Sequence, residues 1–142
     1  MCIRDRPNHF HLTVYELEEN GISRYMQRVL NSYTKYFNVR YKKSGHLFQG
    51  PYKIVHIENE KQLLYLSAYI HRNPIELKKW MKKLEHYPWS SYQDYFKNRW
   101  GALIQAGIIK EQFKNENEYR LFVETSGAKD TQKVEIEDLL ID

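Results

Sequence analysis

Residues 7–14, with the sequence Pro-Asn-His-Phe-His-Leu-Thr-Val, alternate in polarity with the period of two that is typical of a β-strand. Since residues i and i+2 of a strand point to the same side, we expect His9 and His11 to stand side by side, with Phe10 and Leu12 facing a core. Two neutral imidazoles placed in this way are potential ligands for a divalent metal ion. The alternative is that both are polar residues on the solvent side of an amphipathic strand.

A later segment, residues 60–72, has the apolar spacing of a helix. Tyr65, Tyr69 and Asn73 follow one another at i, i+4 and i+8 and so share roughly one side of this helix. A tyrosine hydroxyl can attack phosphorus and hold a covalent phosphoenzyme. An asparagine oxygen is a hard ligand that could complete a two-histidine site for Mg²⁺ or Mn²⁺. The alternative is that the tyrosines are packed aromatics and that the asparagine only ends the helix.

Charge is distributed unevenly along the chain, whose formal net charge is +4. No acidic residue occurs between residues 21 and 57, and residues 40–50 interleave aromatic side chains with cations, which suits a single-stranded nucleic acid. A solvated helix face is the alternative interpretation. The seven basic residues that we assign to DNA binding are Arg24, Arg28, Lys35, Arg40, Lys42, Lys43 and Lys53.

The chain has 142 residues, which suits one domain, and we place that domain at residues 7–125. We expect residues 1–6 to be an unstructured leader and the acidic residues 126–142 to be a flexible tail. Cys2 is the single cysteine, which excludes an internal disulfide bond and indicates a reducing, intracellular compartment. We expect the protein in the cytoplasm, associated with the nucleoid. No apolar run approaches the ~20 residues that cross a bilayer.

The remaining elements follow from periodicity and capping signals. Asn20 or Ser23 is expected to cap the first helix and Asn59 the second, which must end before Pro74. The expected elements are a helix with an apolar stripe over 22–37, a strand over 52–57, the helix over 60–72, a short serine-capped helix through Phe96, and short helices over 102–105 and 116–124.

Five motifs in order carry a resemblance to a known family. The chain resembles the HUH-type single-tyrosine transposases of bacteria, specifically the REP-associated tyrosine transposase group with its insertion-sequence-200-like domain. The similarity runs from Pro7 to Phe96 and more weakly through Val123. The motifs are Pro-Asn-His-Phe-His-Leu at 7–12, Ser-Tyr-Thr-Lys-Tyr-Phe-Asn at 32–38, Ser-Gly-His-Leu-Phe-Gln-Gly-Pro-Tyr-Lys at 44–53, Tyr-Ile-His-Arg-Asn-Pro at 69–74 and Tyr-Pro-Trp-Ser-Ser-Tyr at 87–92.

This resemblance implies an α+β fold of the ferredoxin-like (RRM-like) type, an antiparallel sheet with helices on one face. It implies a metal-dependent single-strand DNA endonuclease and strand transferase that forms a 5′-phosphotyrosine and leaves a free 3′-OH. Carried onto matching positions, His9, His11 and Asn73 become ligands of Mg²⁺ or Mn²⁺, and Tyr69 becomes the nucleophile. Tyr65 is then a second choice, and His71 is expected to be structural or to contact DNA.

The implied partner is single-stranded or hairpin DNA, and a homodimer fits the family as well. Members have a further strand before the histidine strand, and residues 1–6 stand in its place here, so we expect a shortened chain whose sheet lacks its first strand. Two other functions remain open. One is a catalytically inactive nucleic-acid-binding domain, a degenerate transposase remnant; the other is a metal phosphoesterase that uses water.

Overall fold

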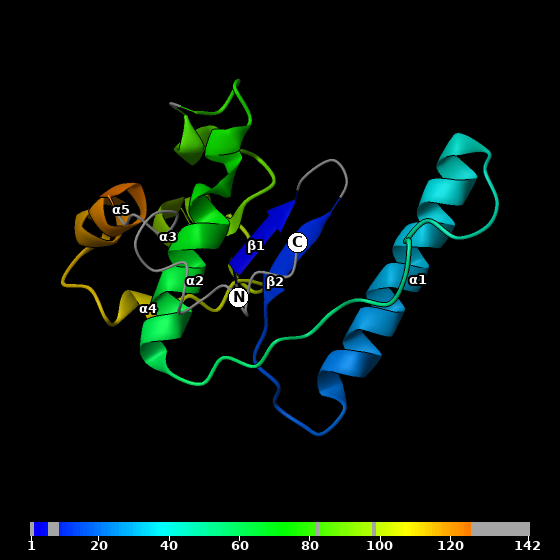
Figure 1. Ribbon diagram of the computed structural model, residues 1–142, viewed down its shortest axis with the longest axis horizontal. Coiled ribbons are helices and arrows are strands. Elements are labelled where there is room, and N and C mark those ends of the chain that lie inside the picture. The colour runs from blue at the N-terminus through cyan, green and yellow to red at the C-terminus, as the bar shows by residue number, and fades with distance from the viewer. Residues whose placement is uncertain (1, 6–8, 82, 98, 126–142) are drawn as a thin grey trace. The chain divides into compact units, whose positions relative to one another are not determined.

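Figure 1 shows the computed structural model, which describes residues 2–5, 9–81, 83–97 and 99–125. The chain divides into two compact units. Unit 1 consists of Met1–Thr13 and Val55–Asp142, and unit 2 is Val14–Ile54. The single domain predicted over residues 7–125 therefore contains two centres of packing, and each is described by itself. The predicted tail at 126–142 lies outside the described residues.

Unit 1 begins with a two-stranded antiparallel sheet, in which β1 (Cys2–Asp5) pairs with β2 (Phe10–Thr13). The register places residue 4 opposite His11 and residue 3 opposite Leu12. The predicted histidine strand is confirmed over Phe10–Thr13, with His9 directly before it, and β2 is half-buried along its length. The prediction of an unstructured leader is wrong for residues 2–5. The sequence of such a short segment is a poor predictor of a strand, because a strand is stabilised by hydrogen bonds to its partner's backbone more than by its own side chains.

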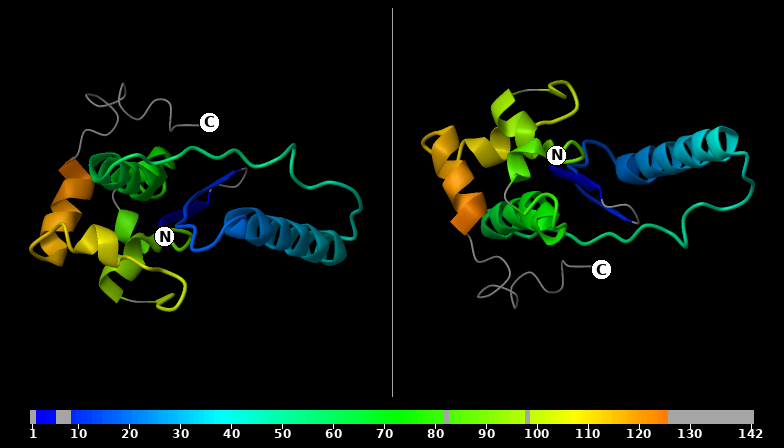
Figure 2. Two further views of the ribbon diagram at one scale, coloured as in Figure 1. Left: turned by 90° about the horizontal axis from the view of Figure 1, so that it is seen from below. Right: turned by 90° about the horizontal axis from the view of Figure 1, so that it is seen from above.

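The second predicted helix is confirmed as α2 (Glu60–Arg72). Its first turn is capped as expected, since the Asn59 side chain accepts a 2.9 Å hydrogen bond from the Gln62 amide. The helix passes into a 3₁₀ turn, η1 (Asn73–Glu76), where Pro74 prevents its continuation. Helix α2 packs against β1 and against α5 (Glu116–Thr125), and the views of Figures 1 and 2 show these elements next to one another.

Short elements complete unit 1: η2 (Leu84–His86), η3 (Ser91–Gln93), α3 (Asp94–Lys97) and α4 (Gly107–Lys110). The predicted serine cap is confirmed, because Ser90 Oγ accepts a 3.2 Å hydrogen bond from the Tyr92 amide. The core is rich in aromatic side chains from η3, α3 and α5. Its buried members are Ala68, Tyr69, Ile70, Leu84, Tyr92, Tyr95, Ile104, Ile109, Tyr119 and Val123.

Two predicted elements are wrong. Residues 52–57 carry no regular secondary structure, although their β-branched composition favoured a strand. The boundary between the two units falls inside this segment, and a strand needs a neighbour for its backbone groups. The helix predicted over 102–105 is a single turn, in which the Trp100 carbonyl accepts hydrogen bonds from the backbone amides of Leu103 and Ile104, and the helix begins only at Gly107. The prediction for the last helix is confirmed by α5.

Unit 2 consists of α1 (Gly21–Tyr41), the loop before it and the segment that follows it. Asn20 occupies the N-cap with a positive φ of 61°, but its side chain makes no cap hydrogen bond. The Glu16 carboxylate accepts the Ile22 amide at 3.1 Å instead, so a loop residue satisfies the helix end. The segment after α1 folds back on it, since Asn38 donates to the Gly45 carbonyl at 3.0 Å. A further hydrogen bond from the Tyr52 hydroxyl to Ser23 Oγ, at 3.2 Å, lies within the same unit.

We predict that Asn59→Ala lowers the free energy of unfolding of unit 1 by about 1 kcal/mol, because the Gln62 amide loses its acceptor. All three tryptophans of the chain (Trp80, Trp89 and Trp100) belong to unit 1, so their fluorescence during urea unfolding reports on that unit. Asn117→Ala, inside α5, is the matched control and should shift stability by less than about 0.5 kcal/mol. Equal destabilisation by both variants would contradict the assigned cap.

Candidate functional site

The two histidines of the first motif lie side by side, as the strand pattern predicted. The rings of His9 and His11 are 5.3 Å apart between centroids and nearly perpendicular, and both residues are half-buried. Imidazoles that bind one ion through bonds of about 2.1 Å have centroids about 5 Å apart, so this spacing is compatible with a shared metal ion. Two neutral nitrogen donors with an amide oxygen are a chemically sound set for Mn²⁺, and for Mg²⁺ with added water ligands.

Tyr69 and Asn73 form the second half of the predicted site. The backbone N–H of Asn73 donates a hydrogen bond to the Tyr69 carbonyl, so the two residues lie one helical turn apart at the end of α2. Their residual exposures are 8% for Tyr69 and 1% for Asn73, which makes both part of the packed interior. Strand β1 pairs with β2 and also packs against α2, so the strand that carries His11 and the helix that carries Tyr69 both contact β1.

Tyr65, the second choice of nucleophile, has a different environment. Its ring lies 5.5 Å from the ring of Phe122 on α5, and the residue is half-buried. This contact is an ordinary aromatic packing interaction between α2 and α5. The geometry therefore gives Tyr65 a structural role on the side of α2 that faces α5.

His71 lies midway between Tyr69 and Asn73 in the chain, and its side chain is completely buried. Its Nδ1 is 2.7 Å from the Tyr119 hydroxyl and its Nε2 is 2.8 Å from Ser91 Oγ. Burial lowers the pKa of His71 from 6.5 to about 3, so the imidazole is neutral at physiological pH. A side chain without exposure cannot contact DNA. Of the two roles expected for His71, the structure shows the structural one.

The hydrogen bonds around His71 form one directed chain. Tyr119 donates its hydroxyl proton to Ser67 Oγ at 3.3 Å, and Ser67 donates to the Leu64 carbonyl at 2.7 Å. A neutral imidazole with its proton on Nδ1 completes the chain, because it donates to Tyr119 and accepts from Ser91. Every hydroxyl in the chain then donates once, and α2 is tied to both η3 and α5.

Sequence reasoning missed the hydrogen-bonded chain that contains His71. Its member Ser67 could have been found, because it precedes His71 by four residues and so lies on the same side of α2. Ser91 and Tyr119 are 20 and 48 residues away along the chain, and no local signal connects them to the helix.

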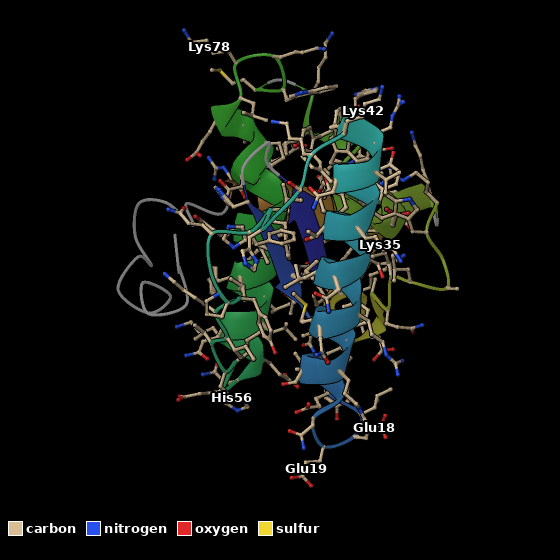
Figure 3. The ribbon with its side chains drawn as sticks, turned by 90° about the vertical axis from the view of Figure 1, so that its right-hand side faces the viewer. Glu18, Glu19, Lys35, Lys42, His56 and Lys78 are labelled. Atoms are coloured by element: carbon tan, nitrogen blue, oxygen red, sulfur yellow. The ribbon has the colours of Figure 1, made fainter. Side chains whose placement is uncertain are left out.

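The seven predicted DNA-binding residues all lie in unit 2. Their side chains are exposed, and Figure 3 shows Lys35 and Lys42 directed outward from α1. Arg24 forms a 2.7 Å ion pair with Glu18, so its charge is partly compensated, while the other six carry no such pair in the structure described. The apolar stripe predicted over 22–37 is partly exposed on α1, with Tyr25 at 39% and Tyr33 at 51%, while Met26 is buried.

Two searches of the described residues were negative. They contain no group of three or more His, Cys, Asp or Glu side chains placed to hold a metal ion, and the predicted ligand set, which includes an asparagine, is of another composition. Within the same part of the chain, none of the helices has the length and apolar character needed to cross a membrane.

A family model described as "Transposase IS200 like" matches residues 2–73, which is half of the chain. The chain belongs to the IS200-like transposase family. This IS200-like transposase is thus a DNA-processing protein, and DNA is its partner. The matched region begins at β1 and ends at Asn73, so it contains both halves of the predicted site. No curated protein and no solved structure matches the chain in the corresponding comparisons.

We predict that His71 makes the stability of unit 1 depend on pH. The unfolded histidine binds a proton below pH 6.5 whereas the folded one resists protonation down to about pH 3, so the free energy of unfolding falls as the pH decreases through this window. The loss should reach about 2 kcal/mol between pH 7 and pH 5. Urea unfolding followed by tryptophan fluorescence at the two pH values measures it.

His71→Gln keeps a neutral donor and acceptor and should remove this pH-dependent loss, although it lowers stability at pH 7. The exposed His56 is the matched control, and His56→Gln should leave the loss unchanged. If His71→Gln retained the full pH dependence, another group would have to be responsible.

Proposed function

We propose that this IS200-like transposase cleaves and rejoins single-stranded DNA through a 5′-phosphotyrosine at Tyr69, with the help of a divalent metal ion. The observation that carries the proposal is the extent of the family match, residues 2–73, which contains the paired histidines, the tyrosine and the asparagine. The adjacent rings of His9 and His11 support it, and so does the helical turn that joins Tyr69 to Asn73.

The proposed reaction is a transesterification. The Tyr69 hydroxyl oxygen attacks the phosphorus of the scissile phosphodiester and loses its proton to solvent, while the bond from phosphorus to the 3′-oxygen breaks. The departing 3′-oxygen takes up a proton and becomes a free 3′-OH. Attack of a 3′-OH on the phosphotyrosine reverses these steps and seals a strand. Because one ester is exchanged for another, the reaction needs no external energy source.

The metal ion would be held by His9, His11 and Asn73. When bound, it supplies positive charge next to the scissile phosphate, which favours charge build-up on the leaving oxygen. The protein's own contribution is positional. The start of β2 and the residue before it place the imidazoles of His11 and His9 next to each other, and the end of α2 fixes the tyrosine relative to the asparagine by a backbone hydrogen bond.

DNA binding is assigned to the exposed cations of unit 2. Helix α1 and the segment after it carry the basic residues together with exposed aromatics such as Tyr33, Tyr36 and Tyr41. Cations that neutralise phosphates and aromatic rings that stack on bases are the usual combination for an unpaired strand. This composition supports single-stranded or hairpin DNA as the substrate.

We predict that Tyr69→Phe abolishes the covalent protein–DNA complex, lowering its formation by about a thousandfold or more, because the attacking oxygen is removed. The complex is measured by denaturing gel electrophoresis after incubation with hairpin-flanked single-stranded DNA and Mn²⁺. The affinity for DNA, measured separately, should be nearly unchanged. Tyr65→Phe is the matched control on the same helix and should retain the complex. A complex that survives in Tyr69→Phe would transfer the role of nucleophile to another tyrosine.

We predict further that His9→Ala and His11→Ala each slow formation of the complex by about 100-fold or more, since each removes a metal ligand. Addition of EDTA to the unmodified protein should have the same effect, and Mn²⁺ should reverse it. His56→Ala, an exposed histidine of the same unit, should leave the rate unchanged. Full activity of the unmodified protein in EDTA would exclude a metal-dependent reaction. DNA binding by the unmodified protein without any cleavage would favour an inactive binding domain.

A further inference from the structure

An exposed tryptophan stands on a firmly held turn of unit 1. Trp89 is 60% exposed, whereas Tyr87 and Ser90 of the same turn are buried, at 4% and 0%. Exposing a large aromatic ring to water is unfavourable, so an exposed tryptophan on a turn that is anchored by buried residues is a candidate for binding a ligand.

The backbone on both sides of Trp89 is fixed by side chains from farther along the chain. Gln93 donates to the Tyr87 carbonyl at 3.2 Å, and Arg99 donates to the Pro88 and Ser90 carbonyls at 3.1 and 2.8 Å. The turn therefore has little freedom to move and bury its ring. A ring that is presented on a pre-organised backbone loses little conformational entropy when it binds a ligand.

The arginine that holds this turn is itself held in place. Asp94 accepts a 2.9 Å hydrogen bond from Arg99 and, through its other oxygen, a 2.6 Å hydrogen bond from the Trp100 amide. The Arg99 guanidinium also lies 4.0 Å from the centre of the Trp100 ring. Since Arg99 is committed to these contacts, it serves to position the turn.

The segment that precedes the turn carries exposed lysines, and its Trp80 packs on Tyr87 of the turn. Lys78, Lys79 and Lys83 are exposed in the segment just before η2, and Figure 3 shows Lys78 projecting from that segment. In this contact the Trp80 ring lies 5.5 Å from that of Tyr87. Lys79 Nζ is 5.2 Å from the Trp80 ring centre.

The charge of this segment is predominantly positive. Residues 77–83 contain no acidic side chain, the exposed Glu76 directly precedes them, and Glu85 after them is paired with Arg120 at 3.4 Å. Exposed cations next to an exposed aromatic ring fit a polyanion whose bases are unstacked, and a duplex hides the base faces inside its stack. A single strand offers both features at once.

We infer that Trp89 and the lysines at 78, 79 and 83 form a second contact for single-stranded DNA, located on unit 1. One base stacks on the indole, and the lysines neutralise neighbouring phosphates. This contact is separate from the seven basic residues of unit 2, and it rests on the proposed function only in taking single-stranded DNA as the ligand. It places a DNA contact on the unit that also contains Tyr69.

The test is the affinity of the full chain for a fluorescein-labelled oligothymidine of about 15 nucleotides, measured by fluorescence anisotropy between about 50 and 200 mM salt. Trp89→Ala should weaken binding about 10-fold, which corresponds to about 1.4 kcal/mol, without changing the salt dependence. Trp89→Phe keeps a stacking ring and should restore most of the affinity. Tryptophan fluorescence of the unmodified protein should be quenched by the oligonucleotide, and Trp89→Ala should lose most of this quenching.

The triple variant Lys78→Ala/Lys79→Ala/Lys83→Ala should act differently. Each phosphate contact on a single strand contributes about 0.7 to the slope of log K against log salt, so removal of three cations should reduce the slope by about 2. Leu121→Ala removes an equally exposed apolar side chain, at 59%, and Lys114→Ala removes an exposed cation away from the turn. Both controls should bind like the unmodified protein.

The inference is overturned if Trp89→Ala binds the oligonucleotide as tightly as the Leu121→Ala control, or if the triple variant keeps the full salt slope. Its failure is distinguishable from failure of the proposed function. A covalent complex that requires Tyr69, together with normal binding by Trp89→Ala, refutes only the contact. Weakened binding by Trp89→Ala in a protein that forms no covalent complex refutes only the chemistry.

Discussion

The hydrogen bonds of the buried His71 side chain are the constraint on which unit 1 depends. A polar ring without any exposure is tolerated only when both nitrogens are satisfied, and here one partner comes from η3 and the other from α5. Leaving either nitrogen without a partner would cost free energy, so these hydrogen bonds favour one arrangement of α2, η3 and α5. Apolar packing alone would discriminate less between alternative arrangements.

This constraint also determines how α2 presents the candidate site. Residues 67–71 are buried without a break, so this part of α2 is enclosed on all sides and has no solvent face that would set its rotation. The hydrogen bonds of His71 set it instead. Tyr69 and Asn73 lie two residues before and after His71, on roughly the opposite side of the helix, so fixing the imidazole fixes the direction of both.

The two units differ in chemical character. Unit 1 contains the buried tyrosine, the asparagine and the paired histidines, and it is held by aromatic packing around η3, α3 and α5. Unit 2 has a long helix with exposed cations and exposed aromatic rings, and Met26 is the buried residue of that helix. A packed unit suits groups that need precise placement, whereas an exposed basic helix suits contacts with a flexible polyanion. The ferredoxin-like sheet remains a proposal, because the described part of the chain shows a sheet of two strands.

The sequence by itself determined the features that depend on neighbours a few residues apart. The strand at His9 and His11, the helix that begins at Asn59 and ends before Pro74, and the basic character of residues 21–57 were all predictable, because periodicity, capping and composition are local. Only the tertiary structure decided which segments pair and which polar groups meet in the core. Residues 2–5 form a strand, residues 52–57 do not, and His71 forms hydrogen bonds with Ser91 and Tyr119. These outcomes were not predictable from local sequence, because each depends on partners distant in the chain.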